Sequence, residues 1–335
     1  MLKQMLITVI AVAVIISGYF WLSRQRGEKY AGSVEKVTIG ISSTSLLPCL
    51  IHIAHEKGFF LNEGVDMEIK GYPAGKFALA GTFDGEVDMC TVADPPIVFN
   101  SFKRDDFAVF ATILDSAQHA KVLARKDRNI NTAKDLIGKK VATTKWTTSY
   151  FFMSTFFIFN GLELSDVELV DLKPKEMVSA ITSGDVDAVF AWEPNILNAK
   201  KTLGGNAIIL PSKVGYTATF NLLSKKAFIK DNPQLLKRIL KALAKAEAFV
   251  RDNRKESIDI IASRLKTDTE LVDMLWDGYT FRLSLAQSLL IILEDQARWA
   301  IKNNLVDIKE VPNYLDYIHV DALEQVVPQV VTIIR

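Results

Sequence analysis

Cysteine is scarce in this chain of 335 residues, which contains only Cys49 and Cys90. Two cysteines are too few for a disulfide framework, and these two do not form a C-x-x-C pair. A single bridge would be possible in an oxidising compartment, but isolated cysteines more often behave as small core residues. We therefore expect two buried free thiols.

The common motifs of enzymes and nucleotide-binding proteins are also missing. The chain contains no G-x-S-x-G, no Walker A loop and no G-x-G-x-x-G. His52 and His55 are followed by Glu56, an order that matches none of the common zinc motifs. These absences favour binding over catalysis, and we expect no metal and no cofactor.

Neither sign of charge is in excess, since 40 Lys and Arg residues face 39 Asp and Glu residues. A nucleic-acid interface needs a clustered basic surface, and the sequence has no basic run, so no nucleic acid is expected as a partner. Hydrophobic residues make up 49% of the chain, which is ordinary for a globular protein. The length is sufficient for two mid-sized domains.

The amino terminus carries a long apolar run. Met5 to Ser23 contains no charged residue and is about long enough to span a bilayer as a helix. We expect residues 1–33 to form an uncleaved membrane anchor plus a linker, with a cleaved signal peptide as the alternative. The basic residues that follow the run would favour a cytoplasmic body, and the family resemblance described below outweighs them.

Strand and helix patterns alternate after the linker. Apolar residues alternate from Val37 to Ile41 and from Val65 to Ile69, and a helical pattern lies between them. Further helices are expected at Gly75–Phe83, Ser149–Asn160 and Pro174–Ser183. This order predicts parallel sheets covered by helices on both faces. From Pro233 onward the pattern is helical and predicts a tail that packs on one domain.

A short pattern occurs twice. Gly85-Glu-Val-Asp88 leads to Asp94-Pro95, and ninety-nine residues later Gly184-Asp-Val-Asp187 leads to Glu193-Pro194. Hydroxyl-rich segments also follow an expected strand in each half. The repeat predicts two similar α/β lobes with a cleft between them.

The hydroxyl-rich segments are candidate ligand-binding sites. Ligands of open α/β sheets sit beyond the carboxyl ends of the strands, and helix amino termini favour anions. A sulfonate, carboxylate, nitrate or phosphate would suit such a site, although Ser and Thr are also ordinary helix caps. The candidate residues are Ser42, Ser43, Thr44, Ser45, Thr147, Thr148 and Ser149.

Six further candidates, Gly75 among them, stand at or beside expected element ends. Asp94 and Glu193 precede prolines, so each either begins a helix or holds an amine or N–H of a ligand. Lys76 follows Gly75 at a helix start, where it is either solvated or directed at an anion. Trp146 stands beside the second hydroxyl-rich segment and Trp192 beside Glu193, and both could stack on a ligand.

Several segments resemble the nitrate, sulfonate and taurine type of ABC-transporter substrate-binding proteins, a family that includes binders of thiamine-precursor pyrimidines. The similar segments are Val37–Ile41, Ala54–Phe60, Gly85–Pro95 and Gly184–Pro194. The resemblance implies an α/β, two-lobed, type 2 periplasmic-binding-protein (Venus-flytrap) fold with a helical C-terminal tail, here behind an N-terminal transmembrane anchor. Asp94 stands where the family often has Glu, and Trp146 where it often has Gly.

The family fold places two crossovers near Leu123–Lys126 and Val214–Leu223. Residues 34–123 with 218–335 would form lobe I and residues 124–217 lobe II. The implied function is non-catalytic capture of a small anionic or zwitterionic solute at the outer face of the membrane, by a monomer that delivers it to the permease and ATPase subunits of an ABC importer. A membrane-anchored sensor and an enzyme similar to fungal thiamine-pyrimidine synthases are the alternatives.

Overall fold

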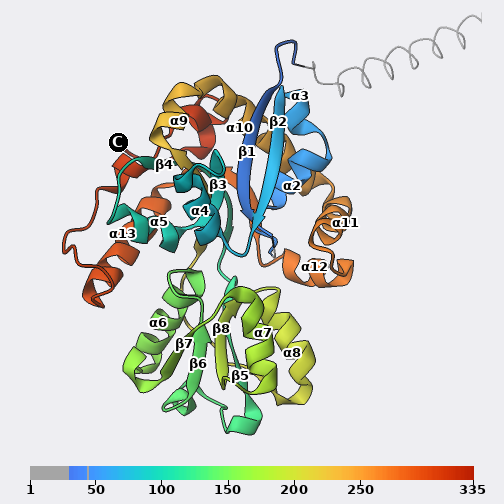
Figure 1. The fold of residues 1–335 in the computed structure, drawn as a ribbon. Helices are drawn as coiled ribbons and strands as arrows, with labels where there is room; N and C mark the ends of the chain where they lie inside the picture. The colour runs from blue at the N-terminus through green and yellow to red at the C-terminus, as the bar shows by residue number, and fades with distance from the viewer. Residues whose placement is uncertain (1–29, 44) are drawn as a thin grey trace, which may run out of the picture.

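The computed structural model describes residues 30–43 and 45–335 (Figure 1). The expected anchor, residues 5–23, lies outside this range, and so does Thr44. Within the part that is described, no helix combines the length and the apolar character needed to cross a bilayer.

A six-stranded sheet forms the core of the larger lobe. Its strands run in the order β11-β4-β10-β3-β1-β2. β1 pairs in parallel with β2 and β3, whereas β10 and β11 are antiparallel to their neighbours. The strands are β1 (Glu35–Ser42), β2 (Val65–Tyr72), β3 (Met89–Ala93), β4 (Phe107–Ser116), β10 (Ala218–Lys225) and β11 (Thr280–Ser284).

Helices cover this sheet, and the helical C-terminal part of the chain, from residue 226 onward, belongs to the same lobe (Figure 1). The longest of them, α10, buries a stripe of leucine, isoleucine and alanine side chains and packs against α2 and α3. The helices are α2 (Cys49–Glu56), α3 (Phe59–Asn62), α4 (Gly75–Asp84), α5 (Asp94–Ser101), α9 (Lys226–Asp231), α10 (Pro233–Asp252), α11 (Arg254–Leu265), α12 (Thr269–Trp276), α13 (Gln287–Lys302) and α14 (Asp321–Glu324).

A five-stranded sheet forms the smaller lobe, in the order β7-β6-β8-β5-β9. Its strands are β5 (Ala120–Arg125), β6 (Lys140–Thr143), β7 (Glu168–Asp171), β8 (Ala188–Trp192) and β9 (Ala207–Ile209), and its helices are α6 (Thr148–Asn160), α7 (Pro174–Ser183) and α8 (Asn195–Leu203). The two-sheet α/β architecture is confirmed. The sheets are mixed rather than parallel. Antiparallel pairing occurs at β4, β5 and β10, the strands next to the places where the chain passes from one lobe to the other.

The chain passes between the lobes at residues 117–119 and 210–217. The first passage lies earlier than expected, because Leu123 is fully buried inside β5 and pairs with Val189 and Ile209 of the smaller sheet. Only three residues separate β4 from β5. None of them is a glycine or proline that would mark the end of a strand in the sequence. The expected second passage overlaps the observed one but extends into β10.

The sequence repeat corresponds to a structural repeat. β3-β1-β2 and β8-β6-β7 have the same order and direction, and α4 and α7 end at Gly85 (φ 78°) and Gly184 (φ 88°) in the left-handed conformation. The carboxylate of Asp88 accepts the N–H of Thr38 at 2.7 Å. Asp88 therefore fastens the start of β3 to the neighbouring strand β1.

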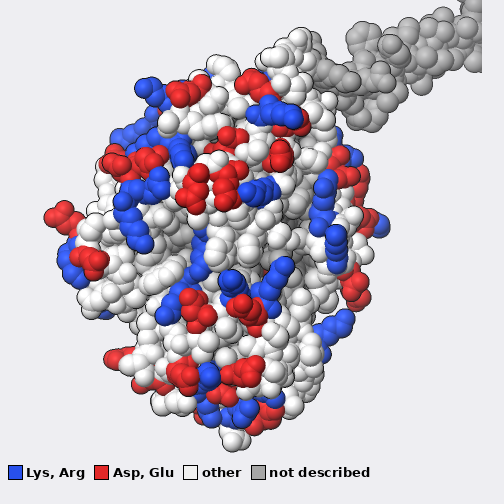
Figure 2. Space-filling model, viewed as in Figure 1, with Lys and Arg blue, Asp and Glu red and all other residues white. Residues whose placement is uncertain are grey.

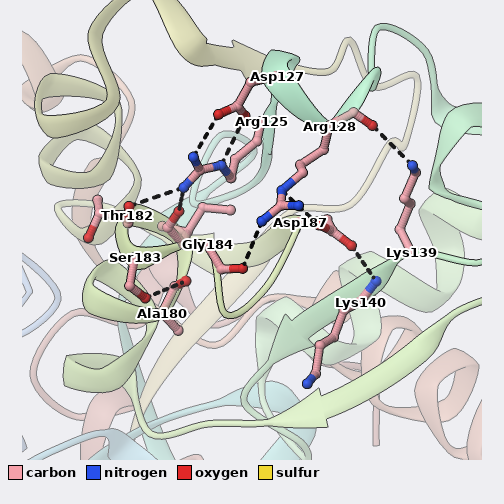
Figure 3. Close-up of polar contacts among 11 residues, drawn as sticks. Arg125, Asp127, Arg128, Lys139, Lys140, Ala180, Thr182, Ser183, Gly184 and Asp187 are labelled. Atoms are coloured by element: carbon pink, nitrogen blue, oxygen red, sulfur yellow. Dashed lines mark hydrogen bonds and ion pairs between the residues drawn. The ribbon is translucent and has the colours of Figure 1, made fainter.

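Figure 3 shows the equivalent contacts in the smaller lobe. The Asp187 carboxylate accepts the N–H of Lys140 at 2.9 Å and lies 3.5 Å from Nε of Arg128. The Arg125 guanidinium donates to the carbonyls of Ile181 and Thr182 at the end of α7. This network joins α7 to the amino ends of β6 and β8, at the end of the sheet opposite the carboxyl ends, and holds the lobe together.

Both cysteines are free and fully buried, as expected. Burial raises the pKa of the Cys90 thiol to about 12, and it raises that of Cys49 as well. Both are therefore inert core residues at neutral pH.

Candidate functional site

A cleft lies between the lobes at the carboxyl ends of β1, β3 and β8, where open α/β sheets bind ligands. Its walls come from both lobes and from the first passage of the chain between them. They consist of Ser42, Leu47, Ala74, Gly75, Lys76, Thr91, Val92, Ala93, Pro96 and Phe220 of the larger lobe, His119 of the first passage, and Thr147, Thr148 and Trp192 of the smaller lobe.

The space in this cleft is only about 30 Å³, whereas pockets for small molecules usually measure about 300–1,000 Å³. The lobes are therefore nearly closed on their own side chains. A solute larger than a few water-sized groups can enter only if the lobes separate.

Two helix amino termini meet at the cleft from opposite lobes. Gly75 and Lys76 begin α4, and Thr147 and Thr148 lie at the start of α6. Neither helix has a side-chain cap, so its first N–H groups are left without a capping acceptor and carry partial positive charge beside the cleft. Gly75 is required sterically, because a Cβ there would lie 3.1 Å from the carbonyl oxygen of Thr91 and 3.2 Å from Cα of Val92.

Trp192 supplies the most informative polar group. Its indole lines the cleft and is only 4% exposed, and its Nε1 has no hydrogen-bond partner within the described part of the chain. An unpaired buried donor costs about 1–3 kcal/mol. This N–H therefore lacks an acceptor within the described chain, at a residue that lines the cleft.

His119 stacks on Trp192, with ring centroids 5.9 Å apart and planes 17° apart. Burial lowers the pKa of His119 to about 3, and Lys121 adds to the shift. The ring is therefore neutral at physiological pH. His119 was not among the predicted site residues, because it belongs to no motif and its only signal in the sequence is its place just before β5.

Lys76 is the one charged side chain among the described residues that line the cleft. Its Nζ reaches across to the smaller lobe and donates to the carbonyl oxygen of Lys145 at 2.9 Å. Burial lowers the pKa of Lys76, and the negative charge of Asp171 opposes this shift. Lys76 thus joins the two lobes and leaves two of its three N–H donors for a solute.

Asp94 does not line the cleft, contrary to the ligand-holding hypothesis. Its buried carboxylate accepts hydrogen bonds from the hydroxyl of Tyr216 (2.7 Å), the N–H of Thr219 (3.0 Å) and Nε2 of Gln296. Burial raises the pKa of Asp94 to about 6, although these donors oppose the shift. Asp94 therefore fastens the second passage, β10 and α13 to the start of α5.

Glu193 is likewise occupied by protein groups. Its carboxylate pairs with Nζ of Lys121 at 2.8 Å and accepts the N–H of Leu197 at 3.0 Å in the first turn of α8. It does not line the cleft. Both acid–proline motifs thus serve the structure, which was the alternative reading of each.

Some of the remaining candidate residues line the cleft, and others bond to protein groups away from it. Ser43 donates to the carbonyl oxygen of Tyr72, Ser45 donates to Ser42, and Ser149 bonds to Thr143 and Thr147. These three do not line the cleft, and Trp146 lines a neighbouring pocket instead. The predicted residues that the structure brings together in the cleft are Ser42, Gly75, Lys76, Thr147, Thr148 and Trp192.

The geometry is that of a two-lobed clamp whose cleft offers hydrogen-bond donors and one cation. On the outer surface, by contrast, acidic and basic side chains are interspersed over the face that Figure 2 shows. The chain belongs to the NMT1/THI5-like family, whose model matches residues 49–257.

Individual proteins are also similar to the chain. A Bacillus subtilis protein named for binding aliphatic sulfonates is 26% identical over 277 residues, 81% of each chain. The periplasmic aliphatic sulphonate binding protein SsuA of Escherichia coli shares the fold, with a TM-score of 0.72, 20% identity and coverage of 85% of this chain and 98% of that one. The desulfurization enzyme DSZB shares it too, with a TM-score of 0.62, 17% identity and coverage of 88% and 99%.

Proposed function

We propose that this protein is an extracytoplasmic solute-binding protein of an ABC importer and that it captures a small organic anion, a sulfonate, in the cleft. The observation that carries the proposal is the unpaired Nε1 of Trp192, buried in the cleft wall. The helix amino termini of α4 and α6 and the Lys76 ammonium add positive potential at the same place.

The charges favour a simple anion over a zwitterion. No acidic side chain occurs among the described residues that line the cleft, since Asp94 and Glu193 are turned to protein donors. An ammonium group enclosed there would be buried without a partner, which costs several kcal/mol. The Bacillus subtilis relative named for aliphatic sulfonates supports the same class of solute.

The cleft is poorly equipped for catalysis of the kind that a nucleophile or an acid–base pair provides. Its described lining contains no cysteine and no carboxylate, and its histidine is buried and neutral. We accordingly propose that the protein captures the solute and delivers it to the permease and ATPase subunits of the importer. We place the protein at the outer face of the membrane, held by residues 1–33.

Isothermal titration of the purified chain, unfolded and refolded to remove carried-over ligand, tests the proposal. Propane-1-sulfonate and taurine form a matched pair, because a methyl group in one replaces the ammonium group of the other. We expect propane-1-sulfonate to bind at least tenfold more tightly. Saturating sulfonate should also raise the melting temperature by a few degrees.

Two results would contradict the proposal. Tighter binding of taurine would show that the cleft reads a zwitterion. No binding of sulfonates, nitrate, sulfate or carboxylates would show that the cleft is not an anion site.

A further inference from the structure

A second cavity, which we call the side pocket, adjoins the cleft and measures about 280 Å³. Lys76 and Pro96 line both spaces, so these two side chains lie at the boundary between them. The other walls of the side pocket are mainly apolar and include Phe77, Phe99, Trp146 and Leu305. It is therefore the nearest room for any part of a solute that the cleft itself cannot hold.

The backbone of Trp146 is held in an unusual conformation. Its φ of 65° lies in the left-handed region, which costs free energy for a bulky residue and persists only where surrounding contacts impose it. Here the ring of Trp146 packs edge-on against Phe99 of the opposite lobe, with centroids 4.6 Å apart. The neighbouring residue, Lys145, accepts the hydrogen bond from Lys76. The turn thus holds an indole at the boundary between the lobes, and 37% of it stays exposed.

The charges of the side pocket match those of the cleft. Lys76 and Lys103 line it, and none of its described lining residues is acidic. Aromatic side chains supply flat apolar surface at a low cost in conformational entropy. An apolar group attached to an anion therefore suits this space, whereas a cationic or strongly polar group does not.

We infer that the solute is a sulfonate with a bulky apolar, preferably aromatic, tail, whose head group lies in the cleft and whose tail passes Lys76 into the side pocket. This inference rests on the proposed function and narrows its substrate class. In this arrangement the methylene stem of Lys76 packs against the tail where the cleft meets the side pocket, while its ammonium group stays near the head group.

The test is a set of sulfonates of increasing tail size, titrated into the full chain. Methanesulfonate, butanesulfonate, octanesulfonate and 2-naphthalenesulfonate are the probes. Each buried methylene group adds about fourfold in affinity, so binding should strengthen steeply along the set. Trp146→Gly removes the indole while accepting the left-handed backbone. It should weaken 2-naphthalenesulfonate about tenfold or more and leave methanesulfonate within twofold.

Two further variants complete the design. Leu305→Ala, in a loop of the larger lobe, leaves the Trp146 turn intact and should reduce the same tail-dependent gain if Trp146→Gly does not fold. Phe159→Ala removes an aromatic ring that is 62% exposed on the same lobe as Trp146 but lies outside the side pocket, and it should change nothing.

Equal affinity along the set, or equal loss of methanesulfonate and 2-naphthalenesulfonate binding in Trp146→Gly, would overturn this inference and leave the proposed function standing. Failure of every sulfonate to bind the unmodified chain would overturn both.

Discussion

Buried polar side chains around the cleft fall into two groups. The carboxylates of Asp94 and Glu193 are satisfied by protein donors, so their removal would leave those donors unpaired. The N–H of Trp192 is the opposite case, because it is buried with no acceptor in the described chain. The first group stabilises the fold, whereas the second lowers stability until an acceptor arrives.

Trp192→Phe should separate these effects. The variant keeps an aromatic ring beside His119 and removes the unpaired N–H together with part of the indole ring volume. Lost ring contacts lower the free energy of unfolding, and loss of a buried unpaired donor offsets part of this, so the net decrease should be no more than about 2 kcal/mol. The affinity for propane-1-sulfonate should fall about tenfold or more, since a hydrogen bond to a charged group is worth about 1.5–3 kcal/mol.

Trp276→Phe is the matched control, because Trp276 is also buried but lies in α12, outside the cleft lining. It should leave the affinity unchanged. Unchanged affinity in Trp192→Phe as well would contradict the role of this N–H.

Asp94 predicts a pH dependence of stability. Its pKa is raised to about 6 in the folded chain, against about 3.9 when unfolded. The folded state therefore binds the proton more tightly, so this contribution to stability is present below pH 4 and is lost as the pH rises through 6. The full effect is about 3 kcal/mol. Asp94→Asn should lack it.

Urea denaturation of both proteins between pH 4 and pH 7.5 measures the difference, in which the other titrating groups cancel. Parallel pH profiles would contradict the prediction. Because Asp94 does not line the cleft, Asp94→Asn should change the affinity for propane-1-sulfonate less than twofold in the folded protein.

The helix–strand units explain why much of the architecture could be predicted. α4 with β3 and α7 with β8 repeat at the same spacing as the glycine and aspartate pattern in the sequence. These signals are local, because the left-handed glycine and the strand-fastening aspartate act within one unit. The helix positions in both units therefore followed from the sequence.

Gly75 shows how such a unit positions the cleft. A Cβ at this residue would press on the backbone of β3, which cannot move aside cheaply. Gly75→Ala should therefore displace the start of α4, lower the free energy of unfolding by about 1–3 kcal/mol and weaken solute binding through the displaced Lys76.

Gly205→Ala is the matched control, because a Cβ there would meet no atom within 4 Å. Its stability should stay within about 0.5 kcal/mol of the original. Denaturation and titration of both variants check the prediction, and an undisturbed Gly75→Ala would show that α4 can shift freely.

Some contacts of the cleft depend on how the whole chain folds and cannot be predicted from local sequence patterns. His119 and Phe220 enter the cleft because the chain passes between the lobes beside them, and β10 brings residues from beyond position 217 next to β3. Such pairings depend on residues more than a hundred positions apart. The same distance explains why the sequence could not decide between the two alternatives for Asp94, since its partners Thr219 and Gln296 are remote in sequence.

Lys76 connects the lobes across the cleft and supplies the charge within it, so one substitution should change both closure and affinity. Lys76→Met removes the bond to the carbonyl oxygen of Lys145 and the cation, but keeps most of the apolar stem. Without ligand, the lobes should separate more often and the radius of gyration from X-ray scattering should increase. The affinity for propane-1-sulfonate should fall about tenfold or more, because a charge-assisted hydrogen bond is lost, and it should depend less on salt.

The repeat offers the control. Lys175 is the second residue of α7, as Lys76 is of α4, but its exposed side chain does not line the cleft. Lys175→Met changes the net charge equally and should leave both the radius of gyration and the affinity unaltered. If Lys76→Met keeps its affinity while the lobes open, the ammonium group serves only to hold the lobes. If it loses affinity without opening, the ammonium group serves only the solute, and the lobes are held by other contacts.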